Sequence, residues 1–231
     1  MSRPLFLVDS FDITVLEGPE GHHAADVLRL RVGAELLLSD GHGRMAEAVV
    51  RAVGRGRLEL FVQGEWYAQR PAPRLVVAQA IAKGDRGELA VQAMTEVGVD
   101  EIVPWPAARS VARWKDGRPL ERWRAVAREA AKQARRAWLP VVSAPVGTAA
   151  LAPRATFVLH ENATERLSTV ELPVRPEIVV VVGPEGGVAP EELAAFTDAG
   201  AVPVRLGDTV LRTSTAGVAA LSVLSARLDR W

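Results

Sequence analysis

The pattern of apolar and polar positions changes character near residue 70. Before that point, short apolar stretches alternate with polar residues, as at Leu58, Leu60 and Val62. This alternation is typical of strands with one buried face. We expect a helix over residues 20–30 and strands over residues 5–8, 13–16, 35–39, 45–53 and 57–63. The sequence Asp-Gly-His-Gly at 40–43 favours a hairpin turn. Short strands joined in this way predict a small β-barrel over residues 1–70.

A proline-rich joint, Gln-Arg-Pro-Ala-Pro at residues 69–73, separates this part from the rest of the chain. Prolines stiffen a short linker, so we place a domain boundary here. From residue 74 onward, apolar strand patterns alternate with helical ones. Strands are expected over 75–81, 100–104, 156–159, 178–182 and 202–206, and helices over 88–97, 119–138, from 190, and through the C-terminal segment to about 229. Alternating strands and helices predict an α/β domain over residues 74–231, with a mostly parallel sheet covered by helices on both faces.

The strongest apolar stretch is 178–182, which consists of five consecutive β-branched residues. This pattern indicates a central parallel strand that is buried on both faces. The stretch stops at Gly183-Pro184-Glu185-Gly186-Gly187, and Pro190 then begins a helix. Glycines allow a sharp turn and a close approach by a ligand. Since ligands of α/β proteins collect at the carboxyl ends of strands, we expect a binding site at this loop.

A second glycine-bearing loop, residues 207–217, follows the strand at 202–206 and leads into a helix rich in Ala, Val and Leu. Two such loops, each leaving an apolar strand, are expected to face one pocket. The alternative is that each is an ordinary strand-to-helix turn.

Composition excludes several classes of site. The 231 residues include no cysteine, which rules out disulfides and cysteine nucleophiles and fits a reducing compartment. The four histidines are scattered and form no metal-binding motif, so no metal is expected. The N-terminus lacks the apolar stretch of a signal peptide, and no apolar run approaches the length of a membrane span. We therefore expect a soluble, cytoplasmic protein with no membrane partner.

Net charge is zero, but the charge is unevenly distributed. Residues 109–136 contain ten Lys and Arg against three acids, a local charge of +7. Such a patch can hold phosphates, although a solvated helix face is the alternative. The basic residues that we expect to contact nucleic-acid phosphates are Arg3, Arg29, Lys83, Arg86, Arg109, Arg113, Arg128, Lys132 and Arg135.

The two loops carry a family resemblance. Gly183-Pro184-Glu185-Gly186-Gly187, followed by Leu206-Gly207 and by Leu211-Arg212-Thr213 before an apolar helix, resembles the SPOUT methyltransferases. The closest match is the RsmE-type family of 16S rRNA uridine-N3 methyltransferases, and the resemblance covers nearly the whole chain. It implies a SPOUT-like, mostly parallel sheet with a C-terminal trefoil knot. It also implies that residues 1–70 form a PUA-like, RNA-binding barrel and that residues 74–231 form the methyltransferase domain.

The resemblance further implies S-adenosylmethionine as the cofactor. Backbone groups of the two glycine loops and of the segment at 159–161 are expected to hold its adenine and methionyl parts, with Leu159, Val182, Leu206 and Leu211 as apolar walls. The cofactor-binding residues carried over are Leu159, His160, Glu161, Val182, Gly183, Pro184, Glu185, Gly186, Gly187, Leu206, Gly207, Val210, Leu211, Thr215 and Ala216.

The implied substrate is uridine N3 of 16S rRNA within the small ribosomal subunit, and the implied assembly is a homodimer. Arg212 is the expected catalytic residue, stabilising the uridine anion or a nearby phosphate, unless it forms a structural salt bridge. No side chain stands out as general base. The family often reads Leu-Arg-Thr-Glu-Thr where this chain has Ser214. Either the family glutamate is structural, which we favour, or this chain uses water or another carboxylate such as Glu185.

Two other functions compete with this interpretation. A dinucleotide-binding oxidoreductase is disfavoured because the loop lacks the Gly-x-Gly-x-x-Gly spacing. A non-catalytic RNA-binding protein of the ribosome is the stronger rival, since a basic helix and a barrel would serve it equally well. Binding of S-adenosylmethionine separates the two hypotheses.

Overall fold

The computed structural model describes residues 3–231, which divide into two compact units. The first unit contains the chain up to residue 70 together with residues 131–139, and the second contains residues 71–130 and 140–231. Residues 1 and 2 of the expected first domain lie outside the described part. We expected residues 1–70 to bind RNA and residues 74–231 to carry out methyl transfer, and this assignment stays a prediction.

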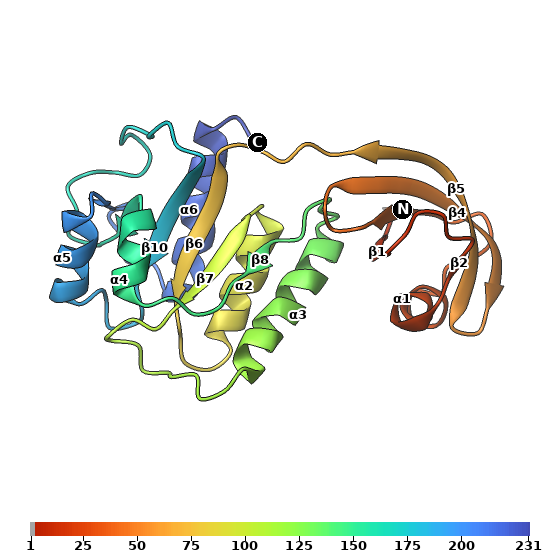
Figure 1. The fold of residues 1–231 in the computed structure, drawn as a ribbon, viewed down its shortest axis with the longest axis horizontal. Helices are drawn as coiled ribbons and strands as arrows, with labels where there is room; N and C mark the ends of the chain where they lie inside the picture. Colours follow the sequence, from red (N-terminus) through yellow and green to blue (C-terminus); the bar gives the residue numbers. More distant parts are fainter. Residues whose placement is uncertain (1–2) are drawn as a thin grey trace. The chain divides into compact units, whose positions relative to one another are not determined.

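The first unit is built on a curled five-stranded sheet in the order β1-β3-β4-β5-β2 (Figure 1). Its strands are β1 (Leu5–Leu7), β2 (Val15–Leu16), β3 (Glu35–Ser39), β4 (Arg44–Gly54) and β5 (Arg57–Tyr67). Strands β1 and β3 are parallel, and the other neighbours are antiparallel. The expected hairpin turn joins β3 to β4, where an Asp40 carboxylate oxygen accepts hydrogen bonds from the backbone of His42 and Arg44.

The helix expected over 20–30 begins and ends earlier in the chain than its pattern indicates. A helical turn, α1 (Gly18–His22), passes directly into a π-helical turn, η1 (His23–Val27). The Leu28 N–H donates to the carbonyl of His23, and Arg29 then takes a left-handed backbone conformation with φ of 53°. This reversal ends the helix where the apolar spacing alone would have continued it.

Residues 131–139 belong to the core of the first unit. On one face of the sheet, Leu5, Leu7 and Met45 pack against Ala137 and Leu139. The indole of Trp138 lies against Gly43, where an added Cβ would come within 2.7 Å of the ring, and its Nε1 donates to the carbonyl of Ala68 at 2.9 Å. The sequence had assigned this segment to the second domain, because nothing local marks it as part of the first.

The second unit is an α/β structure with a six-stranded sheet in the order β11-β9-β10-β6-β7-β8, in which all neighbours are parallel. The strands are β6 (Arg74–Ala80), β7 (Glu101–Trp105), β8 (Val141–Val142), β9 (Phe157–Leu159), β10 (Glu177–Val182) and β11 (Val202–Val204). The helices are α2 (Arg86–Glu96), α3 (Arg118–Gln133), α4 (Thr148–Leu151), the 3-10 turn η2 (Ala152–Arg154), α5 (Pro190–Asp198) and α6 (Thr213–Arg227). The predicted α/β class and parallel sheet are confirmed.

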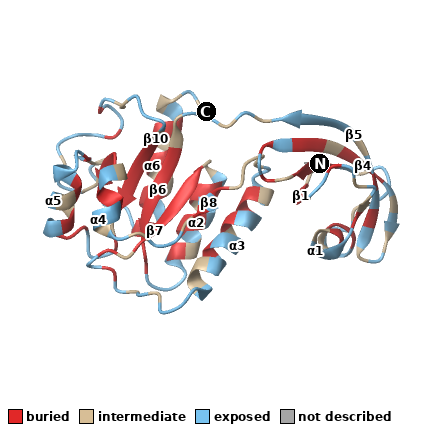
Figure 2. Ribbon diagram, viewed as in Figure 1, coloured by how far each residue is buried: buried red, intermediate tan, exposed pale blue. Residues whose placement is uncertain are grey.

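Helices cover both faces of this sheet, and the central strands are buried (Figure 2). Residues 178, 180 and 182 of β10 join a core formed with α2, α3 and α6. Residues 179 and 181 join a second core formed with α4 and α5. The run of β-branched residues is therefore apolar throughout because both of its faces are covered.

Several boundaries differ from the sequence prediction. Helix α3 ends at Gln133 rather than at 138, because Arg135 takes a φ of 53° and the Arg136 N–H returns to the carbonyl of Ala131. This is a Schellman-type end without the glycine that usually marks it. Strand β11 ends at Val204 rather than at 206, and the short elements β8, α4 and η2 had no sequence signal. The trefoil knot stays a prediction. Within residues 3–231, no helix is both long and apolar enough to cross a membrane.

Candidate functional site

A cavity of about 720 Å³ lies at the carboxyl edge of the parallel sheet in the second unit. Strands β11, β9 and β10 are adjacent and point the same way, so the loops that follow them meet at this edge. The lining comes mainly from residues 159–162, 182–188, 204–207 and 209–213, with Arg86 and Arg109 from the segments after β6 and β7. The site therefore lies where parallel topology brings the strand ends together.

The first glycine loop is a closed turn. Gly187 has a φ of 73°, a left-handed conformation that favours glycine, and its N–H donates to the carbonyl of Pro184 at 2.9 Å. Helix α5 follows at Pro190, with Ala189 as its N-cap. The turn leaves Glu185 and Gly186 lining the cavity.

At the start of the second loop, residues 206–212 leave their backbone N–H groups unpaired. None of these seven N–H groups donates a hydrogen bond to another described residue. Val210 is 76% exposed, and Leu211 is 39% exposed. Backbone donors without protein acceptors can receive a ligand that carries acceptors of its own.

The cavity fits S-adenosylmethionine in size and chemistry. Its volume lies within the range of roughly 300–1,000 Å³ that is typical of small-molecule sites. Leu159, Val182 and Leu206 supply apolar walls suited to an adenine ring. The unpaired N–H groups of the second loop suit the acceptor nitrogens of adenine and the carboxylate of the methionyl part.

Four arginines line the cavity, and three of them have partners. Arg86 pairs with Glu185 at 3.3 Å, Arg109 donates to the carbonyl of Gly186 at 3.2 Å, and Arg205 donates to Asp208 at 3.0 Å.

The fourth arginine, Arg212, has no side-chain partner among residues 3–231. Its backbone forms the N-cap of α6, where unpaired N–H groups and the helix dipole favour negative charge. Arg212 is thus the cavity-lining guanidinium available to an anion.

A buried carboxylate accepts a hydrogen bond from the loop that follows β7 and contains Arg109. One oxygen of Glu192, on α5, accepts hydrogen bonds from the N–H of Ala108 and from the hydroxyl of Thr148, each at 2.9 Å. Gly186 lies next to this loop, since a Cβ built there would be at van der Waals distance, 3.4 Å, from the Arg109 Cβ. In the sequence, Glu192 had looked only like an acid in the first turn of a helix.

The structure brings the predicted cofactor residues together. Every one of them lines the cavity except Thr215, whose hydroxyl instead donates to the carbonyl of Arg212. Asn162 and Arg205 also line it and were missed, because single polar residues after short strands give no specific signal. Ser214 is 5% exposed and lies outside the lining.

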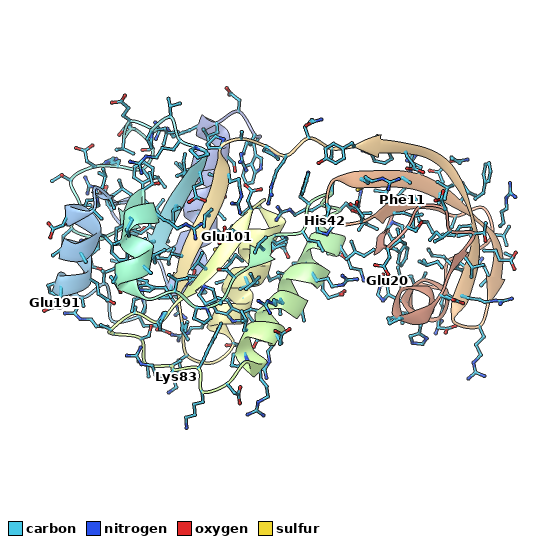
Figure 3. The ribbon with its side chains drawn as sticks, in the orientation of Figure 1. Phe11, Glu20, His42, Lys83, Glu101 and Glu191 are labelled. Carbon is cyan, nitrogen blue, oxygen red and sulfur yellow. The ribbon has the colours of Figure 1, made fainter. Side chains whose placement is uncertain are left out.

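The RNA-binding candidates of the second unit fall into two groups. Arg86 and Arg109 line the cavity, and Lys83 is exposed on the loop that follows β6 (Figure 3). Arg113 donates to the carbonyls of Ala107 and Ala108, and Arg128 is exposed on α3.

The remaining candidates belong to the first unit. Arg29 and Arg135 are exposed, whereas Arg3 pairs with Glu35 and Glu47. The Lys132 ammonium lies 2.9 Å from Glu20, and its side chain is only 10% exposed. Among the nine candidates, Lys132 is therefore poorly placed to reach a phosphate. Within residues 3–231, no group of three or more His, Cys, Asp or Glu is arranged to hold a metal ion.

Two protein families match the chain. Residues 69–225 match the family described as RNA methyltransferase domain, and residues 16–63 match the family described as RNA methyltransferase PUA domain.

Individual relatives agree with these matches. The chain is 46% identical to the ribosomal RNA small subunit methyltransferase E of Mycobacterium bovis, over 100% of this chain and 94% of the relative. A solved structure of the protein with the same name from Neisseria gonorrhoeae, bound to S-adenosylmethionine, superposes with a TM-score of 0.87 at 26% identity, covering 98% of each chain. A methyltransferase from Legionella pneumophila, in complex with the same cofactor, gives a TM-score of 0.84 at 28% identity, covering 97% of each chain.

Proposed function

Because the chain belongs to the RNA methyltransferase family whose relatives are named ribosomal RNA small subunit methyltransferase E, we propose that it methylates N3 of a uridine in 16S rRNA with S-adenosylmethionine as the methyl donor. The family resemblance seen in the glycine loops is confirmed at this level. The observation that carries the proposal is the cavity where both loops meet, with its unpaired backbone donors. A non-catalytic RNA-binding protein would have no use for it.

S-adenosylmethionine supplies, when bound, a methyl group already activated on a sulfonium sulfur. The residues that would hold it are those of the two loops and the apolar walls. The chain must then keep uridine N3 in line with that methyl group and stabilise the charge that develops as N3 loses its proton. Arg212 and the N-terminus of α6 meet this second need together.

The general base remains unassigned. Glu185 has a carboxylate oxygen that already accepts from Arg86 at 3.3 Å and from the Lys83 N–H at 3.4 Å. Ser214 is buried outside the cavity lining, which supports a structural role for the glutamate that the family often has there.

The first prediction tests cofactor binding. A Cβ added at Gly207 meets no atom within 4 Å, so Gly207→Val should fold normally while placing methyl groups in the cavity wall. We expect affinity for S-adenosylmethionine to fall about 10-fold or more in titration calorimetry.

The matched control is Gly64→Val, on β5, where an added Cβ also meets no atom within 4 Å. It should bind the cofactor normally. If both variants bind as tightly as the unaltered chain, the cavity is not the cofactor site.

The second prediction concerns Arg212. Arg212→Ala should lower single-turnover methylation of small ribosomal subunits on the order of 100-fold, because a group aimed at developing negative charge is lost. Ser214→Ala should lose far less, and both variants should still bind the cofactor. A rate for Ser214→Ala as low as that for Arg212→Ala would show that Ser214 acts directly.

We further propose that the basic candidates other than Lys132 contact RNA, with the first unit and the second unit each contributing. The support is the +7 segment at 109–136 and the exposure of Arg29, Arg128 and Arg135. Small-subunit rRNA as the partner also makes the cytoplasm the expected location.

The third prediction is electrostatic. The double variant Arg128→Gln with Arg135→Gln should bind RNA more weakly, and each lost phosphate contact should reduce the slope of log affinity against log salt by about 0.7–0.9. Cofactor affinity should not change. Arg166→Gln with Arg175→Gln, which removes two exposed arginines outside the segment, serves as the control. If both double variants give the same slope of log affinity against log salt, residues 109–136 form a solvated surface rather than an RNA contact.

The homodimer is part of the proposal. Its support is the exposed apolar pair Val210 and Leu211 beside the apolar helix α6. Light scattering at micromolar concentration should give a mass of twice 24.8 kDa, and a mass of one subunit would contradict it.

A further inference from the structure

A buried amide lies in the middle of the parallel sheet. Gln79 of β6 is 0% exposed and sits among residues that are otherwise apolar. Its Nε2 lies 3.0 Å from the hydroxyl and 3.3 Å from the carbonyl of Thr213, and 3.3 Å from the carbonyl of Ala80. Because carbonyls only accept, the donor end of the amide must face them.

The position of Gln79 fixes the direction of the next hydrogen bond. The Thr213 hydroxyl accepts from the Gln79 amide, so its own proton is directed to the carbonyl of Gly183, 2.8 Å away. Among the described residues, this is the only hydrogen bond that joins the first glycine loop to the 206–213 segment. One hydroxyl thus connects the two walls of the cavity.

Glycine at 217 lets α6, which begins with Thr213, pack closely against α2. A Cβ there would lie 2.6 Å from the sulfur of Met94 and 3.5 Å from the Gln79 Oε1. The contact that requires glycine is therefore the one between α6 and Met94 of α2, whereas the distance to Gln79 is an ordinary van der Waals contact.

We propose that Thr213, oriented by Gln79, is a positioning residue for the methyl-transfer site. Its hydroxyl holds the first glycine loop at a fixed position relative to the start of α6. Thr213 directly follows Arg212, so this hydrogen bond also anchors the backbone from which the Arg212 guanidinium extends. The inference rests on the proposed function of the cavity, but the link itself is a property of the chain.

The alternative role for Thr213 is general stability, and Thr156 provides a matched control. Thr156 is 5% exposed and Thr213 is 6% exposed, so both are buried threonines. The Thr156 hydroxyl accepts from the N–H of Val179 at 3.1 Å, in the amino-terminal half of β10, whereas the cavity lies at the carboxyl end of that strand. The change to valine removes one buried hydroxyl in either case, but only at Thr213 does it disconnect the loops.

The test compares Thr213→Val, Thr213→Ser, Gln79→Met and Thr156→Val by thermal unfolding, cofactor titration and hydrogen exchange of the full chain without ligand. Thr213→Val should weaken S-adenosylmethionine binding about 10-fold, since it leaves buried groups unpaired and frees the loops. It should also speed exchange at Gly187, Thr215 and Ala216, whose N–H groups are bonded within these two segments. Thr213→Ser should restore both properties, and Thr156→Val should change neither, even at an equal loss of melting temperature.

Gln79→Met should act through the same hydroxyl. Its effect combined with Thr213→Val should therefore be smaller than the product of the two single effects. Unchanged exchange at Gly187, Thr215 and Ala216 in Thr213→Val, or an equal effect of Thr156→Val, would overturn the inference. If the unaltered chain binds no S-adenosylmethionine while the exchange results hold, the link stands and the proposed function fails.

Discussion

The burial of a parallel sheet on both faces is the constraint on which the rest of this protein depends. Once helices cover both faces, the strand side chains are committed to the two cores. Protein groups can then contact a ligand only beyond the ends of the strands, and the carboxyl ends of parallel strands lie at one edge of the sheet. Backbone of consecutive loops therefore provides much of the cavity wall.

This origin explains the character of the site. It contains few side chains arranged for acid–base chemistry, and three of its four arginines are engaged by Glu185, Gly186 or Asp208. The site provides unpaired backbone N–H groups, an apolar wall and one guanidinium beside a helix N-terminus. An already activated methyl group requires mainly that its acceptor be held in place, so such a site suits methyl transfer better than hydrolysis.

The parts of the fold visible in the sequence are those encoded locally. The β-branched run at 178–182 and the glycines after it predicted a buried strand and a ligand loop because burial and turn geometry act on neighbouring residues. The end of α3 was missed because Arg135 takes a conformation usually reserved for glycine. Gln79 and Glu192 were missed because their importance lies in partners far along the chain, such as Thr213 and Ala108. The same limit applies to Lys132, whose charge suggested RNA until Glu20 was found beside it.

The first unit is discontinuous, and this has a consequence for biosynthesis. Its strands are complete by residue 67, but Ala137 and Leu139 are needed to cover Leu5, Leu7 and Met45. At roughly 5–20 residues per second, translation from residue 70 to residue 139 takes between roughly 3 and 14 s. During that interval the nascent sheet carries an uncovered apolar face while part of the second unit emerges. The order of synthesis therefore does not let the N-terminal unit finish folding first, as a continuous domain would.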